Sequence, residues 1–395
     1  MKKRLLFVDD EPMVLQGIQR MLRPMRGEWE MDFAEGGARA CEFTAAAEYD
    51  VIITDMMMPG MDGAELLARV KEQSPKTVRI VLSGHAEQHL SMKCVGIAHQ
   101  YLSKPCDAAT LKATVSRVTE GSFAVRNQRI MQLVVQLENI PSIPAIFCEI
   151  VRLLKDPDTS MEEVGDLIAR DMAMTAKVLK IVNSSFFGLA QRVSKPTEAA
   201  AYLGLDTLKA LVLATNVFSQ FESNTSQCHL AALAAEHSQH VGAAARAIAR
   251  VEGAPRAVVD EALVAGFLHD VGKLILATNL PEEFERLATS AAPTPIEAER
   301  EVFGTTHAEV GGYLLGLWGL PAAVVEAITL HHAPGATENP NFSALTAVHA
   351  ADFLLSEDSP EAAELDLDYL TRLGLADHLP AWRDAVCELT AAPQN

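Results

Sequence analysis

The sequence predicts a doubly wound parallel α/β sheet of five strands, followed by an all-α helical domain. In residues 1–122, short apolar runs alternate with helix-like stretches, which is the pattern of a parallel sheet. After residue 122 the strand-like runs disappear, and long Ala-, Leu- and Val-rich segments carry apolar residues at the helical spacing. The charge balance changes at the same point. Residues 1–122 hold 15 Lys and Arg against 17 Asp and Glu, whereas the remainder holds 18 against 35.

The expected strands are short and largely continuous in their apolar character. Val51-Ile52-Ile53 and Ile80-Val81-Leu82 do not alternate polar and apolar residues, as expected of strands buried on both faces. The expected strands are Arg4–Val8, Met31–Ala34, Val51–Thr54, Ile80–Leu82 and Gln100–Leu102. The expected helices are Met13–Leu22, Gly37–Ala46, Gly63–Gln73, Ala86–Val95 and Asp107–Val118.

Local signals organise the rest of the chain. Ser160-Met161-Glu162-Glu163 has the capping-box pattern of a helix start, and Pro321 suits the first helical position before Ala322–Leu330. The polar stretch Thr119–Arg129 is the expected connection between the halves. We therefore expect an α/β domain at 1–120, a linker at 121–131, a helical domain at 132–340 and an acidic helical extension at 341–395.

Composition excludes several classes of function. The 395 residues carry a formal net charge of −19, which disfavours both DNA and an anionic membrane surface as partners. The six cysteines are scattered without a C-x-x-C pair, as expected of reduced thiols in a cytoplasmic protein. The apolar run Leu5–Val8 is too short for a signal peptide, and no apolar stretch approaches the roughly 18 residues of a membrane span.

Charged and hydroxyl side chains follow the expected strands at one edge of the predicted sheet. Asp9 and Asp10 follow the first strand, Asp55 the third, Ser83 the fourth and Lys104 the fifth. Ligands of open α/β sheets bind beyond these carboxyl ends. Clustered carboxylates repel one another and favour a hard divalent cation, and a lysine beside them suits phosphoryl transfer. The sequence therefore predicts a metal-assisted phosphoryl-transfer pocket.

The same residues resemble the receiver domain of two-component response regulators. The motifs that carry the resemblance are Asp9-Asp10-Glu11-Pro12, the segment Asp55–Gly63, Ser83-Gly84 and Lys104-Pro105. The resemblance implies that Asp55 accepts a phosphoryl group from a cognate histidine kinase or other phosphodonor. It further implies that Asp10, Asp55 and the Met57 carbonyl ligate Mg²⁺ with help from Asp9, that Ser83 and Lys104 contact the phosphoryl group, and that Tyr101 is the switch aromatic.

A second constellation of metal-ligand residue types lies in the helical half. Its members are His237, His269, Asp270, His307, His331, His332 and Asp352. Neutral imidazole and carboxylate together suit Zn²⁺, Fe or Mn²⁺. The set is large enough for one ion, or for two that share Asp270. Lys273 follows the His269-Asp270 pair and is a candidate phosphate-binding cation.

The helical half resembles the HD superfamily of metal phosphohydrolases, and within it the HDOD output domain. The resemblance rests on Leu137–Pro144, Val178–Gly188, Ala199–Gly204, Phe267–Lys273 and His307–Gly311. It implies a non-hydrolytic signalling module. The Gly-Tyr-Pro motif of cyclic-dinucleotide phosphodiesterases is absent, because Ala333-Pro334-Gly335-Ala336 follows His331-His332.

Three functions remain open from the sequence, and the first is favoured. The first is a regulator in which phosphorylation of Asp55 modulates a helical module that contacts a downstream signalling protein. The second is a metal phosphohydrolase gated by the receiver. The third is a scaffold that the receiver dimerises, and the sequence leaves a homodimer open in each case.

Overall fold

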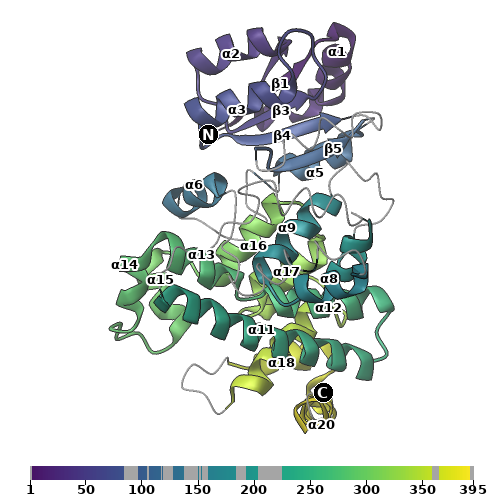
Figure 1. The fold of residues 1–395 in the computed structure, drawn as a ribbon, viewed down its shortest axis with the longest axis vertical. Coiled ribbons are helices and arrows are strands. Elements are labelled where there is room, and N and C mark those ends of the chain that lie inside the picture. Colours follow the sequence, from purple (N-terminus) through teal and green to yellow (C-terminus); the bar gives the residue numbers. More distant parts are fainter. Residues whose placement is uncertain are drawn as a thin grey trace.

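The protein is described here from a computed structural model. The structure describes residues 2–83, 97–104, 106–116, 118, 128–137, 150, 153, 159–183, 193–202, 225–357 and 364–391. A parallel sheet with its helices forms one end of the molecule, and a helical half forms the other (Figure 1). The predicted fold class is therefore confirmed.

The sheet has five parallel strands in the order β2-β1-β3-β4-β5. The strands are β1 (Lys3–Asp9), β2 (Trp29–Glu35), β3 (Val51–Asp55), β4 (Val78–Ser83) and β5 (Gln100–Ser103). Leu5, Phe7 and Ile53 pack on one face of the sheet, whereas Leu6 and Ile52 belong to the core of the other face. Both faces are buried, as the continuous apolar runs predicted.

Helices cover this sheet and join its strands. They are α1 (Pro12–Met21), η1 (Arg23–Gly27), α2 (Gly37–Ala46), α3 (Gly63–Gln73) and α5 (Ala108–Ser116). The helix expected at Ala86–Val95 lies outside the described residues. All the described connections run between parallel strands, so the carboxyl ends of the strands meet at one edge.

The described part of the second half is helical throughout. Its elements are α6 (Gln128–Gln136), α8 (Met161–Ile168), α9 (Met172–Val182), α11 (Thr225–Val251), α12 (Arg256–Leu268), α13 (Val271–Asn279), α14 (Pro281–Leu287), α15 (Pro295–Phe303), α16 (His307–Leu317), α17 (Ala322–Leu330), η5 (Pro334–Ala336), α18 (Ala344–Ser356), α19 (Leu367–Leu373), η6 (Ala376–His378) and α20 (Leu379–Ala391). Ser160 and Glu163 form the expected capping box of α8. Helix α18, from the expected extension, packs against α11, α12 and α17.

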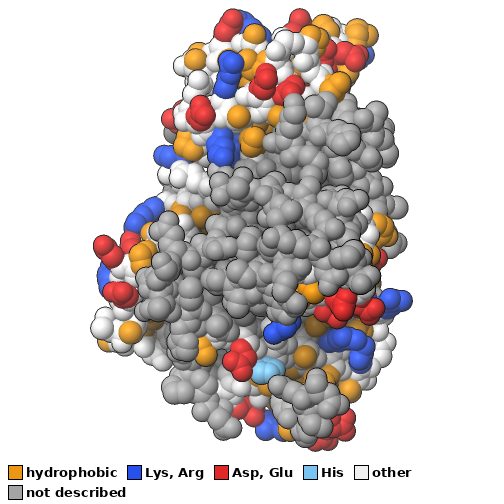
Figure 2. Space-filling view, in the orientation of Figure 1, with side chains coloured by type: hydrophobic (Ala, Val, Ile, Leu, Met, Phe, Trp, Pro, Cys, Tyr) orange, Lys and Arg blue, Asp and Glu red, His pale blue; other side chains and the backbone are white. Residues whose placement is uncertain are grey.

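No single helix among the described residues is both long and apolar enough to cross a membrane. One pair of helical segments, Arg256–Asn279 and Pro281–Leu287, is long and apolar enough for a membrane span when taken together, but the pair is bent by 118°. On the face drawn in Figure 2, acidic and basic side chains of the described residues are interspersed.

Two glycines bring α11 and α12 into close contact. A Cβ at Gly266 would lie 2.8 Å from the Cα of Gly242, and a Cβ at Gly242 would lie 2.7 Å from the Leu263 carbonyl oxygen. Only glycine allows the two backbones to approach this closely. His237 of α11 stands five residues before Gly242, His269 follows Gly266 by three residues at the end of α12, and the two ring centroids are 5.4 Å apart.

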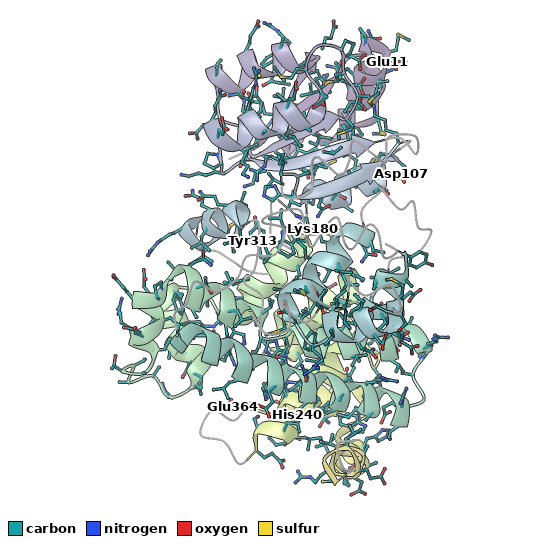
Figure 3. The ribbon with its side chains drawn as sticks, viewed as in Figure 1. Glu11, Asp107, Lys180, His240, Tyr313 and Glu364 are labelled. Atoms are coloured by element: carbon teal, nitrogen blue, oxygen red, sulfur yellow. The ribbon has the colours of Figure 1, made fainter. Side chains whose placement is uncertain are left out.

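The two halves contact each other at the amino end of β5 and at Val118. The Gln100 side chain donates a hydrogen bond to the Gly316 carbonyl at 2.9 Å, and the Tyr313 hydroxyl donates to the Val118 carbonyl at 3.3 Å. His99 accepts from the Arg79 backbone N–H at Nδ1 (2.9 Å), and its Nε2 lies 2.7 Å from the Val135 carbonyl of α6. Figure 3 shows Tyr313 and Lys180 in this zone between the sheet and the helices.

Candidate functional site

The sheet presents a charged pocket at the carboxyl ends of β1 and β3. Asp9 and Asp55 end these strands and are almost fully buried, whereas Asp10 is exposed beside them. Lys104 Nζ lies 2.8 Å from Asp9 Oδ2 and also forms an ion pair with Asp55 Oδ1. One ammonium therefore bridges two buried carboxylates.

Backbone groups fix the orientation of both buried carboxylates. The Glu11 N–H donates to Asp9 Oδ1 and the Met57 N–H donates to Asp55 Oδ2, each at 3.0 Å. Gly63, the first residue of α3, lies so close to the Asp55 carbonyl that any Cβ there would collide with it. This glycine lets α3 pack directly behind the turn that holds Asp55.

Charge in this pocket favours a divalent cation. Burial raises the pKa of Asp55, and the Lys104 ammonium opposes that rise. Burial also lowers the pKa of Lys104, but its pairs with Asp55 and Asp9 raise it above the ordinary value. Three carboxylates beside one ammonium leave an excess of two negative charges, and all the donors are oxygen, which fits Mg²⁺.

Three further residues were predicted for this pocket, and two of them are only partly described. The backbones of Ser83 and Tyr101 lie in β4 and β5, and their side chains lie outside the described residues. The Met57 side chain is 50% exposed, and its N–H is held by Asp55.

The helical half brings all seven predicted ligand residues together from six helices or their ends. His237 lies in α11, His269 and Asp270 join α12 to α13, His307 begins α16, His331 and His332 follow α17, and Asp352 lies in α18. Three sets place one candidate ligand atom per residue within 4.8 Å of one another: His237, His269 and Asp352; His269, Asp270 and His331; and His307, His331 and His332.

Asp270 lies between two groups of these residues. Its Oδ1 is 3.5 Å from His269 Nε2 and 3.2 Å from His307 Nε2, and this buried oxygen has no hydrogen bond of good geometry among the described residues. Beyond His269, Asp352 Oδ1 lies 3.7 Å from His269 Nε2 and 3.1 Å from His237 Nε2.

On the other side of Asp270, three imidazoles meet. His307 Nε2 lies 3.4 Å from His331 Nε2 and 3.3 Å from His332 Nε2. Burial is the main reason that the pKa of His331 is well below its usual value and that of His332 is about 3. These two rings are therefore neutral at pH 7.

Backbone carbonyls fix the tautomers of two buried rings. His269 Nδ1 lies 2.7 Å from the Gly266 carbonyl, and His331 Nδ1 lies 2.6 Å from the Ile328 carbonyl. A carbonyl can only accept, so each Nδ1 carries the hydrogen and each neutral ring presents an unprotonated Nε2. Lone pairs that converge on a buried point beside carboxylates suit a metal ion.

Burial and neighbouring charges shift the pKa values of several groups around this cluster. Burial alone would raise the pKa of Asp270, but His269 and Lys273 hold it well below the usual value. Lys273 Nζ lies 2.8 Å from Asp270 Oδ2, and its side chain is 34% exposed. Burial lowers the pKa of His307, but Glu299 and Asp270 raise it to about 9. The hydrogen bond to Asp352 raises the pKa of His237.

Two residues of this cluster were not predicted from the sequence. Glu299 of α15 contacts His307, and His349 of α18 places its Nδ1 2.7 Å from the His331 carbonyl. His349 stands three residues before Asp352 on the same helix, and this i, i+3 spacing was a usable signal. Glu299 had no such signal, since acidic residues also stand at Glu297 and Glu301.

Comparison with known families divides the chain in two. Residues 5–116 match the family model described as a response regulator receiver domain, and residues 140–334 match the HDOD domain.

Individual relatives match parts of the chain. An uncharacterized protein of Treponema pallidum is 27% identical over 206 residues, covering 50% of this chain and 38% of that protein. The uncharacterized transcriptional regulatory protein YesN of Bacillus subtilis is 32% identical over 123 residues, covering 29% of this chain and 32% of that protein. The chain thus spans about a third of the length of these two curated relatives.

Two solved structures show similarity of the same kind. The receiver domain of an HD domain-containing protein from Pseudomonas fluorescens is 33% identical, covers 30% of this chain and 96% of its own, and has a TM-score of 0.29. The MmoQ response regulator from Methylococcus capsulatus is 26% identical, covers 64% of this chain and 98% of its own, and has a TM-score of 0.46.

Proposed function

Because the chain is a response regulator that joins a receiver domain to an HDOD domain, we propose that phosphorylation of Asp55 modulates a non-hydrolytic HDOD module. That module signals by contact with another protein. The observation that carries the proposal is the position of Lys104, whose ammonium pairs with both Asp9 and Asp55 at the ends of β1 and β3. This arrangement suits transfer of a phosphoryl group to Asp55.

Phosphoryl transfer follows from the charges of the pocket. Asp9, Asp10, Asp55 and the Met57 carbonyl would hold Mg²⁺, which when bound neutralises charge on the phosphoryl oxygens. An Asp55 carboxylate oxygen attacks the phosphorus of the donor. The bond from phosphorus to the donor's leaving group breaks, and the leaving group departs with the electron pair. Lys104 then balances the new negative charge beside Asp55.

A route through one strand, one hydrogen bond and one helix supports coupling between the two halves. Lys104 directly follows β5, and β5 begins at Gln100, which bonds to Gly316 in the last turn of α16. The first residue of α16 is His307 of the histidine cluster. A helix of this length spans about 16 Å at 1.5 Å per residue, so a shift of β5 can reach His307 through one rigid element.

The HDOD ligand set would hold one ion or two. His237, His269 and Asp352 would form one side, and His307, His331 and His332 the other, with Asp270 shared between them. The fixed Nδ1–H tautomers of His269 and His331 support this assignment, as does the unsatisfied Oδ1 of Asp270. Such donors suit Fe, Mn²⁺ or Zn²⁺.

The scarcity of free Lys and Arg side chains beside the cluster, within the described residues, supports a non-hydrolytic role. Among the described residues, Lys273 is the cation beside the ligand set, and its ammonium is already paired with the Asp270 carboxylate. The segment 333–342 contains no Lys or Arg that could hold substrate phosphates. The partners that fit this function are a histidine kinase or other phosphodonor and a downstream signalling protein, without DNA or membrane.

A metal-dependent phosphohydrolase is the second candidate, and one observation favours it. The ligand set is complete and has an accessible side, since the side chains of His237 and Lys273 are about one-third exposed. An ion reached from that side could keep an open coordination position, as catalytic sites do.

Two assays of the full chain test these functions. Incubation with acetyl phosphate and Mg²⁺ should label the wild type and leave D55N unlabelled, and equal labelling of D55N would refute the assignment of Asp55. Turnover of cyclic dinucleotides and model phosphodiesters is then measured with added Mn²⁺ or Fe²⁺, against an H269A/D270A double variant. Background rates in both proteins are expected. A rate near 1 s⁻¹, roughly the low end of ordinary enzymes, that is lost in the double variant would establish the phosphohydrolase instead.

A further inference from the structure

Glu299 is a buried carboxylate, and within the described part of the chain its hydrogen bonds all go to His307. It lies in α15, and only 5% of its surface is exposed. Its Oε2 accepts the backbone N–H of His307 at 2.7 Å, and its Oε1 lies 2.8 Å from His307 Nδ1. Oε2 lies 2.9 Å from the same Nδ1. Burying a carboxylate is costly unless it is well paired, and here His307 is the partner.

Capping of α16 explains only part of this arrangement. Thr306 and Glu309 form a capping box, which satisfies backbone donors at the start of the helix. His307 is the first helical residue, so its N–H has no partner within the helix and Glu299 supplies one. The contact to the ring is additional, because a helix start does not require a carboxylate at Nδ1.

The ring contact determines where the other nitrogen points. With Nδ1 directed at Glu299, Nε2 of His307 faces Asp270 Oδ1 at 3.2 Å, His331 Nε2 at 3.4 Å and His332 Nε2 at 3.3 Å. His269 and His331 are held in a comparable way, but by neutral carbonyls. A carboxylate makes a stronger, charge-assisted hydrogen bond and increases the basicity of the ligand nitrogen.

We propose that Glu299 is a positioning residue for the subsite formed by His307, His331 and His332. It holds Nδ1–H of His307 so that the Nε2 lone pair is directed at the ion. This inference rests on the proposed metal centre and adds a difference between its two subsites. One subsite depends on a carboxylate outside the ligand set, whereas the subsite of His237, His269 and Asp352 does not.

The matched control lies at the same helix junction. Glu309 is also a buried carboxylate, but it contacts Thr305, Thr306 and Arg300 and does not touch the His307 ring. Glutamine at either position keeps the size of the side chain and removes its charge. E309Q therefore reports how any change of charge at this helix junction affects metal binding. E299Q reports that effect together with the loss of the charged contact to His307.

The test is metal binding by full-length wild type, E299Q and E309Q. Stoichiometry and affinity are measured with Zn²⁺ in competition with a chelator, and the ligand field is followed with Co²⁺ by visible absorption. We expect E299Q to lower the affinity for one of two ions about 10–100-fold and to leave the affinity for the other unchanged. The Co²⁺ spectrum should change as well. E309Q should match the wild type in all three readouts.

The outcomes separate this inference from the proposed function. Equal binding and identical Co²⁺ spectra in E299Q and wild type would overturn the role of Glu299 and leave the metal centre standing. Equal weakening in E299Q and E309Q would also overturn it, since the effect would then be structural. A wild type that binds no ion would overturn the metal centre itself.

Discussion

The side chain of Gln100 donates a hydrogen bond of 2.9 Å to the carbonyl of Gly316 and so joins the sheet to the helical half. Gln100 begins β5, which ends one residue before Lys104, and Gly316 lies in the last turn of α16, which begins at His307. One strand and one helix therefore connect the pocket of Asp9, Asp55 and Lys104 with the histidine cluster. This geometry supports the proposed coupling of Asp55 phosphorylation to the second site.

Mg²⁺ should stabilise the receiver half against unfolding. The carboxylates of the pocket outnumber its single ammonium, so a bound cation relieves their repulsion. Mg²⁺ at ten times its dissociation constant should add about 1.4 kcal/mol to the free energy of unfolding. Chemical denaturation with and without Mg²⁺ measures this difference. D10A should lose most of it, and an equal gain in D10A would contradict the assignment of Asp10 as a ligand.

Replacing Gly266 with alanine should separate the helices that carry His237 and His269. The added Cβ would press on the backbone of Gly242, and such overpacking costs about 1–3 kcal/mol. We expect a lower melting temperature and weaker metal binding in G266A. G17A is the matched control, because a Cβ at Gly17 of α1 would meet nothing within 4 Å. Equal stability of the two variants would show that the α11–α12 contact is not tight.

Metal binding in the HDOD half should release protons and weaken as pH falls. His307, with a pKa of about 9, and His237, with a raised pKa, must each be deprotonated before they can ligate an ion. The affinity should therefore fall at least about tenfold per pH unit between pH 8 and 6, where His307 is protonated in the metal-free protein. Calorimetry in buffers of different ionisation enthalpy measures the protons released. An affinity independent of pH would contradict ligation through these rings.

The contact between the halves should weaken below about pH 6.5, the ordinary histidine pKa. Burial holds the pKa of His99 well below that value, and the nearby charges of Arg79, Lys180 and Lys71 lower it further. The unfolded state then binds the proton more readily than the folded state, so stability is lost as pH falls. The loss attributable to this group is up to about 1.4 kcal/mol per pH unit.

H99Q isolates this effect from the other histidines. We expect the free energy of unfolding of the wild type to fall more steeply than that of H99Q between pH 6.5 and 5. Denaturation curves at several pH values provide the comparison. Parallel pH dependences in the two proteins would exclude His99 as the source.

Much of the receiver half follows directly from local sequence patterns. The run Arg4–Val8 became β1 (Lys3–Asp9), and the expected helix Gly63–Gln73 was found with the same bounds. Buried parallel strands leave continuous apolar runs, and glycine or aspartate marks the starts of α2, α3 and α5. The carboxyl-end residues Asp9 and Asp55 could be placed together because parallel topology fixes that edge.

Other features depend on contacts between distant segments. Glu299 could not be distinguished from Glu297 or Glu301, because only the turn into α16 decides which of them faces His307. Gln100 is an ordinary polar residue at a strand start, and its partner lies 216 residues away. The seven candidate ligand residues could be nominated by type, but their division around Asp270 required the packing of α11, α12, α16, α17 and α18.

Hydrogen exchange in the full chain tests most directly whether phosphorylation of Asp55 reaches the HDOD half. Exchange is measured with Mg²⁺, with and without acetyl phosphate, and intact mass confirms the phosphorylation. We predict altered exchange in peptides covering residues 97–118 and α16 of the wild type, and no change in D55N. Fully phosphorylated wild type with unchanged exchange in α16 would contradict the coupling.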